Sequence, residues 1–218
     1  MSAQKARADA AAKHYAGGIV DDIMVVGVGG QGVIVAAAII ADAALLHGGL
    51  EVKLSETRGM SQRGGSVNSD IRFGTKVYSP LIPDGKVDFL VAFEQMEALR
   101  YSPGLGEGAT LIVNVQKIQP STVASGAAKY PDGILSLLAS YTPNVLALDA
   151  EALAKQAGSI RSVNIVLLGA LSRFLDVPPE VWDKALRDRL SGKGLEANLN
   201  AFKLGQEAGG RAAGSSRR

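Results

Sequence analysis

The stretch of sequence that decides the fold runs from Ile23 to His47 and reads IMVVGVGGQGVIVAAAIIADAALLH. Its first four residues are a continuous apolar run, which is typical of a strand buried on both faces. The glycine turn leads into residues 33–47, which are small and apolar almost throughout, with Gly48 available as a C-terminal cap. The pattern therefore predicts a strand, a tight turn and a buried helix, and residues 50–54 are predicted to complete a βαβ unit as a second parallel strand.

A long loop and a hairpin are predicted next along the chain. Residues 55–66 contain too many small and polar residues for a regular element, so we predict a loop there. Residues 67–73 and 76–81 flank Gly74-Thr75, a two-residue turn whose leading glycine suits a type II′ hairpin. The sheet is therefore predicted to be mixed.

The remaining elements continue the alternation of strands and helices. We expect strands at 87–93, 110–115 and 145–148, and helices at 94–101, 149–157, 164–175, from Pro178-Pro179 onward and at 195–206. Such alternation predicts an α/β fold, a three-layer α/β/α sandwich of Rossmann-like type with a mostly parallel mixed sheet, one β-hairpin and C-terminal helices. We expect a flexible leader at 1–18, a single α/β domain at 19–207 and a disordered tail at 208–218.

The charge balance argues against a nucleic-acid partner. The formal net charge of +2 comes from 23 basic and 21 acidic residues, but the last eleven residues contribute Arg211, Arg217 and Arg218 with no acid. Without those three, 20 basic residues face the same 21 acidic ones. This is not the concentrated positive field that neutralises phosphates in nucleic-acid binders.

The residue inventory also bears on metals, membranes and location. The chain has no cysteine, and its only histidines are His14 and His47, whereas iron–sulfur clusters need thiolates and zinc sites need cysteines or several histidines. We therefore expect no metal site in this chain. Glycines interrupt the longest apolar stretch well before the roughly 20 residues that span a bilayer, and the N-terminus lacks the apolar core of a secretory signal. A cytoplasmic protein without a membrane partner is expected.

The glycine loop has two interpretations. Residues 27–32 satisfy the G-x-G-x-x-G pattern between a strand and a helix, where side-chain-free residues let backbone N–H groups approach a phosphate. Alternatively, the glycines permit a tight turn and close packing of helix on strand. The acidic ribose partner of a dinucleotide site is not well placed, because Glu51 opens the next strand and Glu56 lies beyond it. The cofactor-binding candidates in this loop are Gly27, Gly29, Gly30, Gln31 and Gly32.

A second segment, residues 57–66, is expected to line the same ligand-binding crevice as the glycine loop. It combines two guanidinium groups, several hydroxyl and amide donors and exposed glycine backbone, which suit a phosphate or a carboxylate. Because it follows the second predicted strand, it should lie at the carboxyl edge of the sheet, where open α/β sheets bind ligands. The alternative is a docking surface whose arginines pair with carboxylates of another subunit. Its candidate residues are Arg58, Ser61, Gln62, Arg63, Gly64, Gly65 and Ser66.

A resemblance to a known family rests on several segments together. They are the GVGGQG loop at 27–32, the GMSQRGGS run at 59–66, the VYSPLI run at 77–82, and AFE at 92–94 followed by EALR at 97–100, with weaker echoes at 162–169 and 200–202. This combination resembles the small subunit of indolepyruvate ferredoxin oxidoreductase. The same module is the gamma subunit, or gamma domain, of the wider pyruvate and 2-oxoglutarate families.

The resemblance implies a role within a complex rather than independent catalysis. Such complexes oxidatively decarboxylate a 2-oxoacid, pass electrons through iron–sulfur clusters to ferredoxin and release an acyl-CoA. In this family thiamine diphosphate and the clusters belong to large catalytic partner subunits, so the resemblance implies an isolated chain that is inactive and has no catalytic residue of its own. The resemblance makes the glycine loop and the Arg58/Arg63 loop candidates for coenzyme A contacts or for docking between domains. One departure is Arg58, where indolepyruvate-type members often have histidine. It leaves a 2-oxoglutarate or general 2-oxoacid enzyme open.

Two other functions remain as alternatives from the residues alone. The fingerprint at 27–32 also fits a free-standing NAD(P)-dependent dehydrogenase, although no evident catalytic arrangement or substrate domain follows it. A non-enzymatic nucleotide sensor is the third hypothesis. Glu94 and Glu97 lie on one helix face and resemble an acid/base pair, but first-turn glutamates are ordinary partners of the helix dipole.

Overall fold

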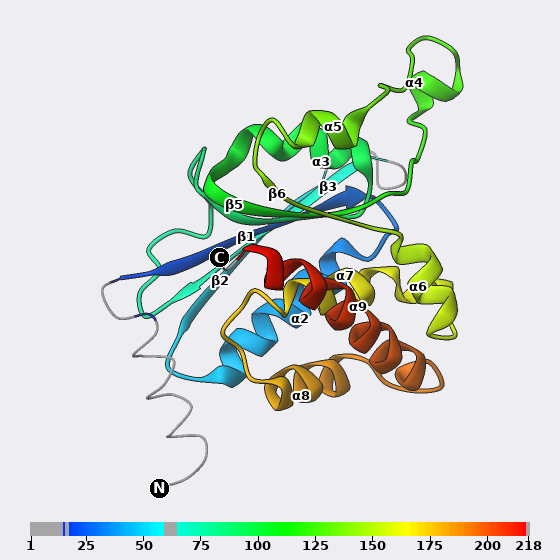
Figure 1. The fold of residues 1–218 in the computed structure, drawn as a ribbon. Helices are drawn as coiled ribbons and strands as arrows, with labels where there is room; N and C mark the ends of the chain where they lie inside the picture. The colour runs from blue at the N-terminus through cyan, green and yellow to red at the C-terminus, as the bar shows by residue number, and fades with distance from the viewer. Residues whose placement is uncertain (1–14, 16–17, 59–64, 217–218) are drawn as a thin grey trace, which may run out of the picture.

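The computed structural model describes residue 15 and residues 18–58 and 65–216 (Figure 1). Six strands form one sheet in the order β2-β3-β1-β4-β5-β6. Their bounds are β1 Val20–Val28, β2 Glu51–Arg58, β3 Ser66–Gly74, β4 Val87–Ala92, β5 Leu105–Asn114 and β6 Asn144–Leu148. Strand β3 is antiparallel to both β1 and β2, whereas β1, β4, β5 and β6 pair in parallel. The sheet is mixed, as predicted.

Helices cover both faces of the sheet and make the predicted three-layer sandwich. One face carries α3 Gln95–Tyr101 and α5 Ile134–Leu138, and the short helix α4 Ser121–Ala124 projects from that side (Figure 1). The other face carries α2 Val33–His47, α6 Ala150–Gln156, α7 Val163–Leu171, α8 Pro179–Arg189 and α9 Leu195–Ser216. Two short 3-10 turns lie at Ser102–Gly104 and Ile160–Ser162.

The strand β1 and the helix α2 lie at the centre of this architecture, as their apolar sequences predict. Ile23 and Val25 of β1 are fully buried on the α2 face, and Val26 is fully buried on the α3 face. A strand between two helical layers must be apolar on both sides, which is what the continuous run at 23–26 encodes. Burial of this kind contributes roughly 25 cal/mol for each Å² of apolar surface removed from water.

The predicted hairpin and βαβ unit were wrong in their pairing. Strand β2 runs in the same direction as β1, but β3 lies between them, so the unit is split by an antiparallel strand. The hairpin joins β2 to β3, and β2 continues to Arg58 through part of the predicted loop. Residues 76–81 form no strand, because the Ser79 and Leu81 carbonyls accept hydrogen bonds from Arg72 instead of a neighbouring strand.

The last helix extends beyond its predicted end. It was predicted at 195–206 with a disordered tail from 208, whereas α9 continues to Ser216. Glycines bring α9 against α7: a Cβ at Gly205 would lie 2.0 Å from the Val166 carbonyl oxygen, and one at Gly209 would lie 2.7 Å from that of Ala170. This contact with α7 continues past residue 206, which propensity alone does not reveal.

Tyr15 is the one residue of the predicted leader before residue 18 that the structure describes. Tyr15 lies within the predicted leader, yet it is fully buried, stacks edge-on against Phe73 at 6.0 Å between ring centroids and donates a hydrogen bond to Asp21 at 2.6 Å. The division into leader, domain and tail stays a prediction. Within the described part of the chain, no helix is long and apolar enough to cross a membrane.

Candidate functional site at the carboxyl edge of the sheet

The glycine loop lies where the parallel strands end. Residues 29–32 connect the end of β1 to the start of α2, and the Gly29 N–H donates a hydrogen bond of 2.8 Å to the Gly65 carbonyl. Val28 pairs with Ser66, so the chain enters β3 at this same edge. The structure thus brings Gly65 and Ser66 of the second segment beside the glycine loop.

The glycines of the loop serve different purposes. A Cβ at Gly27 would lie 2.9 Å from Val33 Cγ2 and 3.0 Å from the Phe93 Cβ, so this glycine permits close packing. Gly32 has φ of +86° as the N-cap of α2, and a Cβ there would lie 2.8 Å from the Asn164 Nδ2. Gly30 has φ of +104° but faces open space, with no atom within 4 Å of an added Cβ. Packing therefore explains Gly27 and Gly32, while Gly30 leaves the backbone accessible.

The Gln31 side chain is engaged within the protein. Its Oε1 accepts a hydrogen bond of 2.7 Å from the Val28 N–H, and its Nε2 donates to the Phe93 carbonyl and the Gln116 Oε1, both at 3.1 Å. Gln116 in turn donates to the Glu151 carboxylate. This chain of hydrogen bonds joins the segments that follow β1, β4 and β5 to helix α6. Gln31 therefore shapes the loop with its side chain and with its backbone, because its N–H donates a hydrogen bond of 3.1 Å to the Val28 carbonyl.

Glu94 and Glu97 are both structural in this geometry. Glu94 caps α3 by accepting hydrogen bonds from the N–H groups of Met96 at 2.7 Å and Glu97 at 3.1 Å, and its other oxygen accepts from Ile118 and Tyr130. Burial and this carboxylate together raise the pKa of Tyr130.

Glu97 links α3 to the start of β3. Only 4% of its surface is exposed, and it accepts hydrogen bonds from Ser66 Oγ at 2.5 Å and from Arg100 Nε at 3.2 Å. The Ser66 hydroxyl also lies 3.1 Å from the Tyr101 hydroxyl. Ser66, a predicted binding residue, is thus hydrogen-bonded to α3, which fixes the place where the second segment rejoins the sheet.

The predicted site residues divide into those the structure brings together and those it does not describe. Gly27, Gly29, Gly30, Gln31, Gly32, Gly65 and Ser66 gather at the carboxyl edge of the sheet. Ser61, Gln62, Arg63, Gly64 and the side chain of Arg58 lie outside the described residues, and their contribution stays a prediction.

Sequence reasoning missed three polar residues at this edge. Gln116 and Glu151 complete the network of Gln31, and Asn164 contacts Gly32. A signal existed for Asn164, because it is the one polar residue within the apolar helix α7, which reads VNIVLLGAL. Within the described part of the chain, no group of three or more histidine, cysteine or carboxylate side chains is arranged to hold a metal ion.

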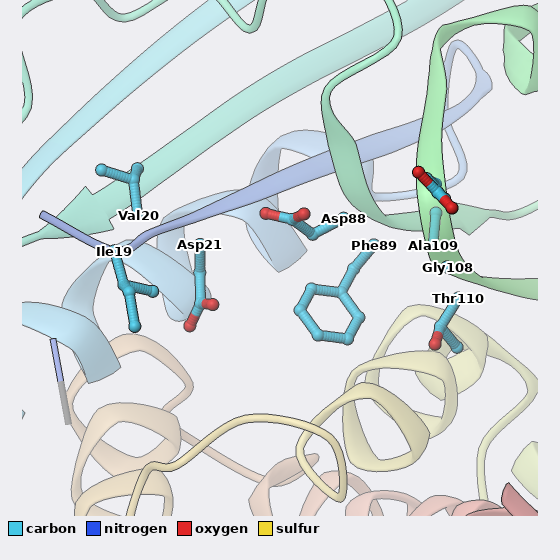
Figure 2. A pocket seen from close by; sticks show the side chains of 9 residues that line it. Ile19, Val20, Asp21, Asp88, Phe89, Gly108, Ala109 and Thr110 are labelled. Atoms are coloured by element: carbon cyan, nitrogen blue, oxygen red, sulfur yellow. The ribbon is translucent and has the colours of Figure 1, made fainter. Parts of the chain in front are cut away.

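A cavity of about 300 Å³ lies at the opposite edge, where β1, β4 and β5 begin (Figure 2). Three carboxylates line it, those of Asp21, Asp88 and Glu107, together with the ring of Phe89. Burial raises the pKa of Asp88, although its carboxylate accepts a hydrogen bond of 2.9 Å from the Asp22 N–H. This edge is acidic, so it does not suit an anionic ligand.

Comparison with known proteins identifies the family. The family model described as pyruvate ferredoxin/flavodoxin oxidoreductase matches residues 22–208, which is most of the chain. The chain belongs to the pyruvate ferredoxin/flavodoxin oxidoreductase family. A member from Archaeoglobus fulgidus, named indolepyruvate oxidoreductase subunit IorB, is 43% identical over 188 residues, covering 84% of this chain and 92% of its own.

Solved structures of the oxidoreductase family have the same fold. The gamma subunit of a keto/oxoacid ferredoxin oxidoreductase from Geobacter sulfurreducens aligns with a TM-score of 0.63 and 30% identity, covering 87% of this chain and 98% of its own. A 2-oxoglutarate:ferredoxin oxidoreductase from Magnetococcus marinus, with 2-oxoglutarate, coenzyme A and succinyl-CoA bound, aligns with a TM-score of 0.67 and 25% identity. That match covers 88% of this chain but 31% of the Magnetococcus chain.

Proposed function

We propose that this chain is the gamma-type, non-catalytic subunit of a 2-oxoacid:ferredoxin oxidoreductase complex of the indolepyruvate type. The observation that carries the proposal is the 43% identity to an IorB subunit over nearly the whole of both chains. The complex would decarboxylate an aryl-substituted 2-oxoacid, transfer the electrons to ferredoxin and release the acyl-CoA. The comparisons give no support to a free-standing dehydrogenase or to a nucleotide sensor.

The cofactors of oxidation belong, in this proposal, to large catalytic partner subunits. The chain has no cysteine with which to hold an iron–sulfur cluster. The two carboxylates that resembled an acid/base pair are committed to capping α3 and to binding Ser66 and Arg100. Thiamine diphosphate, the clusters and the ferredoxin contact are therefore assigned to the partners, in a cytoplasmic complex.

Coenzyme A is the ligand that we assign to the carboxyl edge of the sheet. Three features support this assignment: the accessible backbone at Gly30, the N-terminus of α2 behind it, and the bound coenzyme A in the Magnetococcus relative. The N-terminal N–H groups of a helix favour phosphate groups. In this proposal Arg58 and Arg63, with Ser61, Gln62 and Gly64, form the second wall of the site or dock against a partner subunit.

Anaerobic purification of the tagged chain at its native expression level tests the proposal. We expect a large cysteine-rich subunit to copurify, bringing thiamine diphosphate and reducing ferredoxin when indolepyruvate and coenzyme A are both supplied. Pyruvate and 2-oxoglutarate as alternative substrates test the substrate class. Recovery of a monomer or homodimer alone, in a preparation where a control complex stays intact, would contradict the proposal.

A further inference from the structure

Asn164 is a buried polar residue in an apolar setting. It is the second residue of α7, every other member of which is apolar or glycine, and only 7% of its surface is exposed. Among the residues that the structure describes, its carboxamide makes no hydrogen bond, and its polar atoms are not among those sealed from solvent without a partner, so water or a ligand can reach them. Close packing alone would favour an apolar residue here.

The carboxamide of Asn164 lies against the N-terminus of α2. Its Nδ2 would be 2.8 Å from a Cβ at Gly32, the N-cap of that helix, so only a glycine lets the two approach. Asn164 itself belongs to the first turn of α7. The positive ends of two helices therefore meet at this point, and both favour a negatively charged group.

The neighbouring amide of Gln31 shows the contrast. Gln31 uses its Oε1 once and its Nε2 twice in hydrogen bonds within the protein. Asn164 has two potential donor hydrogens and an acceptor oxygen. Its side chain lies against Gly32, where the same loop meets α2. The Gln31 amide thus holds the loop together, whereas the Asn164 amide, on α7 beside the loop, is available to a ligand.

We propose that the Asn164 carboxamide donates a hydrogen bond to a phosphoryl oxygen bound at the N-terminus of α2. The inference rests on the proposed assignment of coenzyme A to this edge and adds the residue that recognises its phosphate. A neutral donor flanked by two helix N-termini stabilises the anion without a basic side chain. The phosphoryl group belongs to the diphosphate or to the 3′-phosphate of coenzyme A, which share this chemistry.

Substitutions of Asn164 in the intact complex test the inference. Calorimetric titration with coenzyme A should show about a tenfold loss of affinity in Asn164→Ala, which removes one hydrogen bond to a charged group. Asn164→Asp should lose more than tenfold, because a carboxylate repels the phosphate. The melting temperature of Asn164→Asp should not fall, since a carboxylate near a helix N-terminus is favourable. A purely structural role would instead lower stability and leave affinity unchanged.

Titration with dephospho-coenzyme A separates the two sources of the phosphoryl group. Equal losses for both ligands indicate the diphosphate, and a loss for coenzyme A alone indicates the 3′-phosphate. Asn144→Ala is the matched control, because Asn144 donates to the Gly108 carbonyl at the opposite edge of the sheet. It should bind coenzyme A like the unaltered complex.

The loop variant Gly30→Asp separates two questions: whether coenzyme A binds at this edge, and whether Asn164 contacts its phosphate. Gly30→Asp places a carboxylate in the open space over the loop and should weaken coenzyme A binding if the ligand lies there. Loss of affinity in Gly30→Asp with unchanged affinity in both Asn164 variants would overturn the role of Asn164 alone. Unchanged affinity in all three variants would overturn the assignment of coenzyme A to this edge as well.

Discussion

The two edges of the sheet are built from opposite chemistry. At the carboxyl edge, glycine backbone, the start of α2 and neutral amides gather around residues 27–32. At the amino edge, the carboxylates of Asp21, Asp88 and Glu107 line a cavity of about 300 Å³. The first arrangement offers helix N–H donors of the kind that bind phosphate, and the carboxylates of Glu94, Glu97 and Glu151 there are hydrogen-bonded within the protein.

The volume of a cavity is therefore a poor guide to where coenzyme A binds in this fold. The amino-edge cavity is open, but its charge opposes the anionic cosubstrate of the proposed reaction. At the carboxyl edge, many polar groups form hydrogen bonds within the protein, as the Gln31 side chain does. Among the residues that the structure describes here, the backbone near Gly30 and the carboxamide of Asn164 remain for a ligand.

A glycine substitution at each edge should have the largest effect. Gly32 and Gly108 both have positive φ, but an added Cβ would meet Asn164 at 2.8 Å only in the first case, and open space in the second. Left-handed backbone alone should cost Gly108→Ala about 1–2 kcal/mol, whereas Gly32→Ala should lose about 1 kcal/mol more, because the Asn164 side chain must also move. Denaturant unfolding of the purified variants measures both, and equal losses would contradict the packing described for Gly32.

Removal of the Gln31 side chain should have the next largest effect. Gln31→Ala leaves the Val28 N–H without its side-chain partner and removes one of the two donors of the Phe93 carbonyl, which keeps its hydrogen bond from Asn114 Nδ2. We therefore expect a loss of about 1–2 kcal/mol in unfolding free energy. Gln119→Ala is the control, because Gln119 is exposed and, like Gln116 of the network, follows β5. It should change stability by less than about 0.5 kcal/mol. A loss no larger than that of the control would show that the network does not hold the loop.

The stability of the folded chain should depend on pH through Asp88 at the amino edge. Burial raises the pKa of Asp88 in the folded chain, so its charged form opposes folding, and stability is lost as the pH rises through that pKa. Asp88→Asn removes this cost. The variant should therefore melt at a higher temperature than the unaltered protein at pH 7.5, and the difference should shrink toward pH 4. A difference that grows on acidification would contradict this account.

Much of the fold was predictable because burial imposes simple patterns. The apolar run at 23–26 and the following helix at 33–47 were predicted correctly, since a central strand and its covering helix must exclude polar side chains. The family was also predictable, from short motifs that occur together. The partner of β3 was not predictable, because Gly74-Thr75 fits a hairpin turn by pattern alone. In the structure Arg72 instead binds the Ser79 and Leu81 carbonyls, and β3 pairs with β1 and β2.

The site was predictable in location but not in detail. The glycine pattern correctly indicated a turn between strand and helix, but the sequence does not say which glycine faces a neighbour and which faces open space. That distinction depends on Asn164, which lies 132 positions from Gly32 in the sequence and reaches it only through the packing of α7 against α2. Gln116 and Glu151 were missed for the same reason.

Hydrogen–deuterium exchange on the intact complex, with and without coenzyme A, tests whether coenzyme A binds at the glycine loop. We expect coenzyme A to protect the backbone amides of residues 28–36 at the carboxyl edge. Residues 19–21 and 107–110, at the amino edge, should exchange at the same rate in both states and serve as the internal control. Protection confined to the amino edge, or to the partner subunits alone, would contradict the assignment of coenzyme A to this chain's glycine loop.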